Sequence, residues 1–159
     1  MVQNVAREGA PSETGAKRGW IMEYEATVGY ADLTGAGPPY QLLVEFPVGA
    51  HSAALLAFEE EVVGGHVTLL GQITNGVGAS FHVRDSAGGG AEIVTLNYVE
   101  PLLDGRSLAE MPTQTVYYRY NRTDFVEVGR GETYDPHEPY DIPRSVRPFL
   151  SPEWVAEYG

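Results

Sequence analysis

Histidine side chains offer this chain its most direct route to metal or acid–base chemistry. There are four of them: His51, His66, His82 and His137. Metal sites on strands, loops and helices use pairs with a one-, three- or four-residue spacing, and no two of these histidines have such a spacing. We therefore predict that the histidines lie at the surface or at the rim of the fold.

The segment that starts at Phe46 resembles the first metal-binding motif of the cupins. Phe46-Pro47-Val48-Gly49-Ala50-His51 is followed by three glutamates at 59–61 and by Gly64-Gly65. That motif uses two histidines separated by one residue and then a glutamate. Position 53, where the second histidine would stand, is Ala. The resemblance implies an alternative function: a cupin-like small β-barrel that binds a metal or small ligand through His51, His66 and a carboxylate.

Motifs for nucleophilic catalysis and phosphate binding are missing. The chain has no cysteine, which excludes thiolate nucleophiles, thiolate ligands and disulfides. It has no G-x-S-x-G elbow. The glycine-rich loop 87–90 lacks the lysine of a P-loop and joins two expected strands. The glutamates at 59–61 alternate between the two faces of an extended chain, so they do not converge. We predict a non-enzymatic protein with no catalytic residue, cofactor or metal.

The charge balance argues against nucleic acid and anionic membranes as partners. The net charge is −12, and only ten residues are lysine or arginine, whereas phosphate groups are bound by basic surfaces. No run of 18 apolar residues is present, and the first 19 residues lack the apolar segment of a signal peptide. The length of 159 residues and the 43% hydrophobic content predict one domain with one core.

Apolar and polar residues alternate with period two through most of residues 19–128, which indicates half-buried β-strands. The expected strands lie at 19–30, 40–46, 66–73, 78–84, 92–99, 115–120 and 125–128. Turn residues separate them, at 34–39, 75–76, 85–90, 104–105 and 121–122. This pattern predicts a mainly β fold, either an antiparallel β-sandwich or a jelly-roll-like barrel, with extended N- and C-terminal arms.

Two local predictions concern how the strands pair and face. Asn75-Gly76 is a favoured two-residue hairpin turn, so we expect strands 66–73 and 78–84 to pair. Phe81 and Val83 are expected to point inward. In the strand at 40–46 one face holds the large residues Tyr40, Leu42, Val44 and Phe46.

Three segments have helical features. Residues 51–61 fit either a helix or a strand, but three glutamates at a helix C-terminus oppose its dipole, which favours the strand. A short helix is expected at 107–110. Another is expected at 151–158, where Ser151 is a suitable N-cap and Pro152 suits the first helical position.

The chain divides into three zones. Residues 1–18 form a flexible leader, 19–128 the β core, and 129–159 an extended arm that is rich in proline and tyrosine and ends in a short helix. Tyrosine suits interfaces because its ring is rigid and amphipathic. We predict that the arm binds a partner through Tyr134, Tyr140, Ile142, Phe149, Leu150, Trp154 and Tyr158. Packing of the arm on its own sheet is the open alternative.

Three segments resemble the small capsid decoration (cement) and related head proteins of tailed bacteriophages. They are Tyr30-Ala31-Asp32-Leu33-Thr34, FPVGA at 46–50, and VVGGHVTLLGQITNGVGASFHVRDSAGG at 62–89. The pattern differs from the family in two places. Residues 51–61 separate two elements that usually run together, and Arg84 stands where the family has glycine.

This resemblance implies a β-sandwich in the virion that binds the outer capsid surface and bridges neighbouring subunits, after synthesis in the cytoplasm of a bacterial host. The implied partners are the major capsid protein and other copies of the chain, in a homotrimer whose arms reach adjacent subunits. Repetition by symmetry turns many weak contacts into avidity. A tail or fibre component of a virion is a further alternative.

Overall fold

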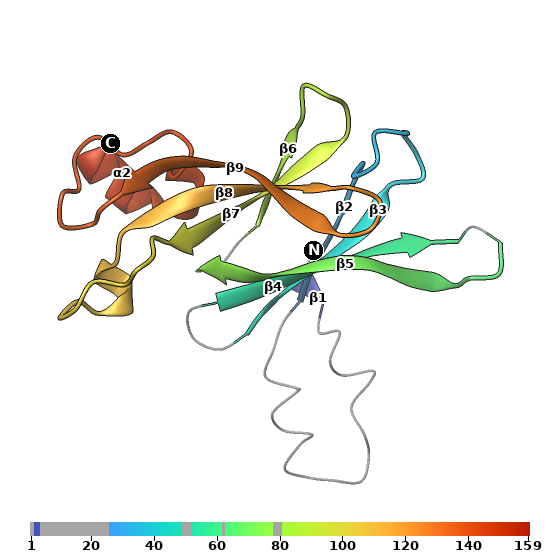
Figure 1. Cartoon of the computed structure of the whole chain (residues 1–159), viewed down its shortest axis with the longest axis horizontal. Coiled ribbons are helices and arrows are strands. Elements are labelled where there is room, and N and C mark those ends of the chain that lie inside the picture. Colours follow the sequence, from blue (N-terminus) through green and yellow to red (C-terminus); the bar gives the residue numbers. More distant parts are fainter. Residues whose placement is uncertain (1, 4–25, 49–51, 62, 78–80) are drawn as a thin grey trace, which may run out of the picture.

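Two antiparallel sheets built from consecutive strands form the body of the protein (Figure 1). The computed structural model describes residues 2–3, 26–48, 52–61, 63–77 and 81–159. The first sheet has five strands in sequence order: β1 (Val2–Gln3), β2 (Ala26–Ala31), β3 (Gln41–Pro47), β4 (Ser52–Glu60) and β5 (Val67–Val77). The second sheet has four: β6 (His82–Asp85), β7 (Ala91–Tyr98), β8 (Thr113–Tyr120) and β9 (Phe125–Tyr134).

The predicted β-sandwich is therefore confirmed, and the strands form no closed barrel. Each sheet is a simple meander, because all neighbouring strands in the described chain are also consecutive in sequence. Short helical segments complete the fold: η2 (Leu108–Glu110), η3 (Arg147–Phe149) and α2 (Pro152–Tyr158). The Ser151 side chain caps α2 by accepting a hydrogen bond from the Trp154 N–H, as the sequence predicted.

The hairpin predicted at Asn75-Gly76 is wrong. Both residues lie inside β5, where Gly76 pairs with Ala53 of β4. The strand at 82–85 pairs instead with β7 in the other sheet. The turn preference of Asn-Gly is local, and it was overridden by pairing along the whole length of β4. The uncertain segment 51–61 is a strand, β4, over residues 52–60.

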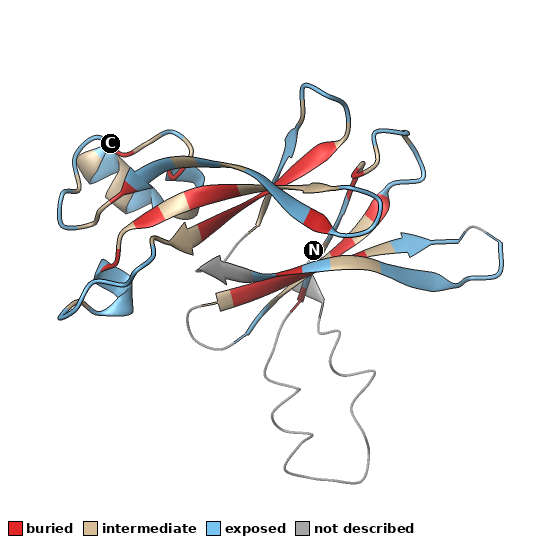
Figure 2. Ribbon diagram, in the orientation of Figure 1, coloured by how far each residue is buried: buried red, intermediate tan, exposed pale blue. Residues whose placement is uncertain are grey.

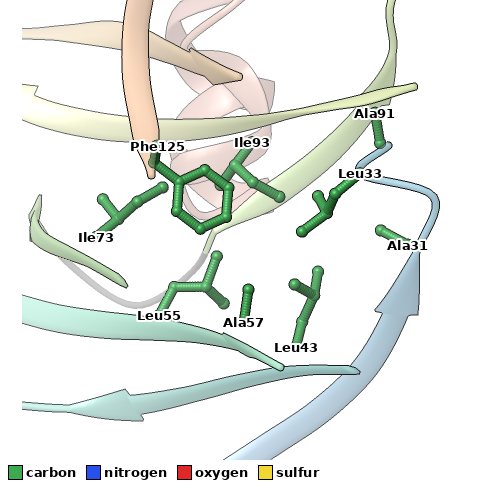
Figure 3. Close-up of a cluster of buried hydrophobic side chains, with 9 residues drawn as sticks. All are labelled: Ala31, Leu33, Leu43, Leu55, Ala57, Ile73, Ala91, Ile93 and Phe125. Carbon is green, nitrogen blue, oxygen red and sulfur yellow. The ribbon is translucent and has the colours of Figure 1, made fainter. Parts of the chain in front are cut away.

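One hydrophobic cluster joins the two sheets (Figure 3). The first sheet and its β2–β3 loop contribute Ala31, Leu33, Leu43, Leu55, Ala57 and Ile73, and the second sheet contributes Ala91, Ile93 and Phe125. Phe81 packs against this cluster as predicted, whereas Val83, also predicted to point inward, is half exposed at the sheet edge. The cluster is the sandwich core that an antiparallel pair of sheets requires.

The face of β3 that enters this core is the one with fewer large residues. Gln41 and Leu43 are buried, and Leu42, Val44 and Phe46 are half-buried on the opposite face. The buried Gln41 amide is accommodated because its Oε1 accepts a hydrogen bond from the Leu33 N–H at 2.8 Å. Tertiary packing thus selected the face, against the larger number of apolar side chains on the opposite one.

Strand β7 is buried on both of its faces (Figure 2). Residues 91–96 are all buried, which is unusual for a strand of a two-layer antiparallel sandwich with one wet face. One face of β7 meets the first sheet through Ala91 and Ile93, and the other is covered by the C-terminal segment that follows β9. Strand β9 itself runs on to Tyr134, past the residue 128 at which the sequence ended the β core.

Candidate protein-binding surfaces

The C-terminal segment folds back onto the outer face of the second sheet. Its buried residues Ile142 and Val146 form a second cluster with Leu96 of β7 and Tyr134 of β9. Phe149, Leu150, Trp154 and Tyr158 pack against that cluster. The Trp154 indole N–H donates to the Tyr134 hydroxyl at 2.5 Å, which fixes α2 over the end of β9. The segment is a cover for the sheet, with its own apolar contacts.

This arrangement places six of the seven predicted partner-contact residues against their own chain. Tyr134 and Ile142 are buried, and Phe149, Leu150, Trp154 and Tyr158 are partly buried. Tyr140 alone is largely exposed, at 72%, although its ring meets that of Tyr158 edge to face. Leu96 and Val146, which lie at the centre of this cluster, were not among the predicted partner contacts. Alternation in β7 was the available signal for Leu96.

A charged network lies on the same outer face. Glu92 is 7% exposed at its side chain, and its carboxylate pairs with Arg84 at 2.7 Å and with Arg119 at 2.6 Å. Arg119 also donates to the Ser86 hydroxyl, and the Arg84 guanidinium lies 3.7 Å above the Tyr117 ring. Burial raises the pKa of Glu92, but the two arginines outweigh it and hold the pKa below its usual value. The network ties β6, β7 and β8 together.

The loop between β7 and β8 is fixed by a second ion pair. Arg106 binds both carboxylate oxygens of Asp135, at 2.8 and 3.0 Å. Within the loop, Ser107 donates to Glu110 from its backbone N–H and its hydroxyl, and these bonds lower the pKa of Glu110 to about 2. These contacts order the loop. The same loop exposes the aliphatic residues Leu102, Leu103 and Leu108.

The tip of the β4–β5 hairpin, residues 59–61 and 63–69, lies at the opposite end of the molecule from α2 (Figure 1). Val63 is 87% exposed, and Val67 and Leu69 are each more than half exposed. Glu59, Glu60 and Glu61 are exposed beside them. Strand β4 of this hairpin lies in the residues 51–61 that separate two of the resemblance segments, and residues 63–69 of the tip belong to the third. Its aliphatic residues cluster on a projecting feature, where a second protein surface has access to them.

The two turns with the resemblance motifs meet at one edge of the sandwich. In the β2–β3 loop the Asp32 carboxylate accepts hydrogen bonds from the N–H groups of Gly35 and Gly37, at 2.8 and 2.9 Å. The Ala91 N–H at the start of β7 donates to the Asp32 carbonyl at 2.6 Å. A Cβ at Gly35 would lie only 3.0 Å from the Gly90 nitrogen, so the two turns pack closely because both are glycines. The motif residue Asp32 thus has a clear structural role.

The described residues do not form the alternative, cupin-like metal site. His66 is exposed at the tip of the β4–β5 hairpin, and His82 packs its ring edge to face on Phe149. His137 lies 3.4 Å from Glu110. His51 lies outside the described residues. Among the residues that the structure describes, no group of three His, Cys, Asp or Glu side chains is placed to hold a metal ion.

The exposed apolar residues therefore define the candidate surfaces: the hairpin tip, the β7–β8 loop, and an edge surface around Tyr30, Tyr40 and Val83.

Within the described ranges, no helix is both long and apolar enough to cross a membrane. The chain matches no protein-family model, no curated protein and no solved structure.

Proposed function

We propose that this protein is a non-enzymatic structural component of a virion that binds the outer surface of a capsid and bridges neighbouring subunits. The observation that carries the proposal is the β4–β5 hairpin tip, which projects from the sandwich with Val63, Val67 and Leu69 exposed. Large aliphatic residues gathered on a projection are costly to hydrate and are typical of contact surfaces. The partner supplies the apolar cover that the described part of the chain does not provide there.

The energetics suit a contact that is repeated many times. Burying one large aliphatic side chain contributes about 1.5–3 kcal/mol, from which the entropy of association must be subtracted. A hairpin tip by itself therefore gives a weak contact. A shell presents the same contact at every symmetry-related position, and a trimer that engages three such positions gains avidity.

The resemblance to capsid decoration proteins supports the same assignment. The segments that carry it form the β2–β3 loop, β5 and the β6–β7 turn, which are elements of the sandwich scaffold. Strand β4 lies in residues 51–61, which separate two of the resemblance segments, whereas Val63, Val67 and Leu69 lie within the third segment. Loops and hairpins on a rigid scaffold are where binding functions concentrate.

The test is co-sedimentation with empty shells assembled from the major capsid protein of the same genome. The double variant Val67→Asn with Leu69→Asn removes apolar surface from the tip without adding charge. We expect its apparent affinity for shells to fall at least about tenfold, which corresponds to about 1.4 kcal/mol. The matched control is Thr68→Asn, which changes an exposed residue between them and should bind as the natural chain does.

Solution mass by light scattering gives the second readout. A mass of three chains, either alone or on the shell, supports the bridging arrangement. Failure of the unmodified chain to sediment with shells would overturn the capsid assignment. Equal binding by the double variant and the control would show that the hairpin tip is not the contact surface.

A further inference from the structure

A depression of about 460 Å³ lies where the β2–β3 loop meets the β6–β7 turn. Both sheets contribute to it, through Tyr30, Asp32 and Tyr40 on one side and Val83, Asp85 and Gly90 on the other. Its volume is within the range of about 300–1,000 Å³ that is usual for small-ligand sites. It is therefore large enough to receive a long side chain from another protein.

The lining is acidic. Asp32 and Asp85 both contribute, and among the described residues no lysine, arginine or histidine lines the depression. The Asp32 carboxylate is held by backbone N–H groups of its own loop, whereas the exposed Asp85 side chain has no hydrogen bond or ion pair with any described residue. A larger depression of about 610 Å³ beside the C-terminal segment differs, because Arg144 and Arg147 there offset Glu132 and Asp141.

The lining also offers aromatic and apolar surface. Tyr30 and Tyr40 are 59% and 50% exposed, and Val83 is half exposed next to them. The small buried residues Ala31 and Ala91 form part of the same lining. Aromatic faces attract cations, most often the guanidinium of arginine, and apolar walls accommodate the methylene groups of its stem. Carboxylates bind the same guanidinium through two parallel hydrogen bonds.

We infer that this depression is a binding site for an arginine side chain of the partner protein. The guanidinium pairs with Asp85 and packs on the exposed tyrosines, and its stem lies on Val83. A basic partner segment also complements the net charge of −12. The inference rests on the proposed function, since it names the chemistry that a partner surface presents to the end of the first sheet from which the β4–β5 hairpin also projects.

The site is preorganised by backbone contacts within and between its two turns. The Ser86 N–H donates to the Gly90 carbonyl at 3.0 Å, and the Ala91 N–H donates to the Asp32 carbonyl at 2.6 Å. These bonds fix the backbone around Asp32 and Asp85 before a ligand arrives. A rigid site loses less entropy on binding than a mobile one.

The experiment is an NMR titration of the isotopically labelled full chain with the peptide acetyl-Gly-Arg-Gly-Arg-Gly-amide. We expect saturable shifts of the backbone amides of Gly89, Gly90 and Ala91, and weaker binding as salt is added. The matched peptide carries citrulline in place of arginine, which keeps the shape and removes the charge. It should leave these signals unchanged.

Substitutions then separate the contributions. Asp85→Asn should weaken binding of the arginine peptide about tenfold, or about 1.4 kcal/mol, and Tyr30→Ala or Tyr40→Ala should weaken it severalfold. Asp104→Asn, in the exposed β7–β8 loop, makes the same change of charge elsewhere and should have no effect. Equal weakening by Asp85→Asn and Asp104→Asn would show a general charge effect and overturn the site.

The outcomes distinguish this inference from the proposed function. If the natural chain binds shells but the arginine peptide causes no shift, the arginine site is wrong and the capsid assignment stands. If the peptide binds at the depression but the chain does not sediment with shells, the site exists and its partner is another basic protein. Binding of the citrulline peptide with equal affinity would overturn the arginine site.

Discussion

The β4–β5 hairpin tip and the C-terminal segment are both extensions of the sandwich, yet they end in opposite environments. Each combines apolar side chains with acidic ones. The C-terminal segment turns back, and its Ile142 and Val146 are buried against Leu96. The hairpin runs outward and leaves Val63 in solvent. The difference shows that composition alone does not identify a binding surface, because the same residue types serve a core wherever the chain can reach a sheet face.

Geometry explains the two outcomes. The residues after β9 lie within reach of the outer face of the second sheet, where β7 offers Leu96 and β9 offers Tyr134. Their prolines supply the bends that keep the segment on that face. The hairpin tip is held by pairing between β4 and β5, so its turn extends past both sheets. No described element of the chain covers its aliphatic residues.

The largest effect on the free energy of unfolding is expected from Ile142→Ala. This substitution leaves a cavity between the C-terminal segment and the second sheet, and it should lower the free energy of unfolding by about 2–5 kcal/mol. Urea denaturation measures the change. Tyr140→Ala, in the same segment but exposed, is the control and should cost well under half as much. Equal effects would mean that the segment is not part of the folded core.

Glu92→Gln should have the next largest effect and lower the free energy of unfolding by about 1–3 kcal/mol at neutral pH. The reason is that it leaves Arg84 and Arg119 without their shared carboxylate. The folded protein lowers the pKa of Glu92, so the ionised form favours folding. Its stabilisation is complete above the unfolded value of 4.5 and is lost as the pH falls below that value and through the folded pKa.

Urea denaturation at decreasing pH tests this dependence. The difference between the natural chain and Glu92→Gln should shrink steadily below pH 4.5. Glu60→Gln, at an exposed position of the hairpin, serves as the control. A difference that stays constant down to strongly acidic pH would exclude the ion pairs as its cause.

Tyr134→Phe should lower the free energy of unfolding by less, about 0.5–1.5 kcal/mol. It removes the hydroxyl that accepts from the Trp154 indole N–H and so loosens α2. Hydrogen exchange should then accelerate at the amides of α2 more than in β7. The control is Tyr140→Phe, whose ring is exposed. Unchanged exchange in α2 would show that the apolar contacts alone hold the helix.

The smallest effect on stability belongs to the hairpin tip. Val67→Asn with Leu69→Asn should change the free energy of unfolding by less than about 0.5 kcal/mol, since surface substitutions rarely do more. A large loss of stability would instead place the hairpin tip in the folding core. Together with Ile142→Ala, this variant tests whether the two extensions differ as the structure indicates.

Much of the fold was predictable because the alternation of apolar and polar residues is a local property of each strand. Alternation identified most of the strands, and glycine-rich turns marked the β2–β3 loop and the β6–β7 turn. The cap at Ser151 correctly placed the last helix. The Asn75-Gly76 hairpin failed because a two-residue turn signal competes with pairing along a whole strand.

The sequence by itself determined the strand periodicity, the main turns, the acidic charge and the absence of cysteine chemistry. Only the tertiary structure decided which strands share a sheet, that Gln41 and Leu43 face the core, and that Tyr134 and Ile142 are buried while the hairpin tip is exposed. These features depend on which surfaces the folded chain brings within reach of one another. An apolar residue carries the same preference for burial everywhere, and only the three-dimensional path of the chain determines what buries it.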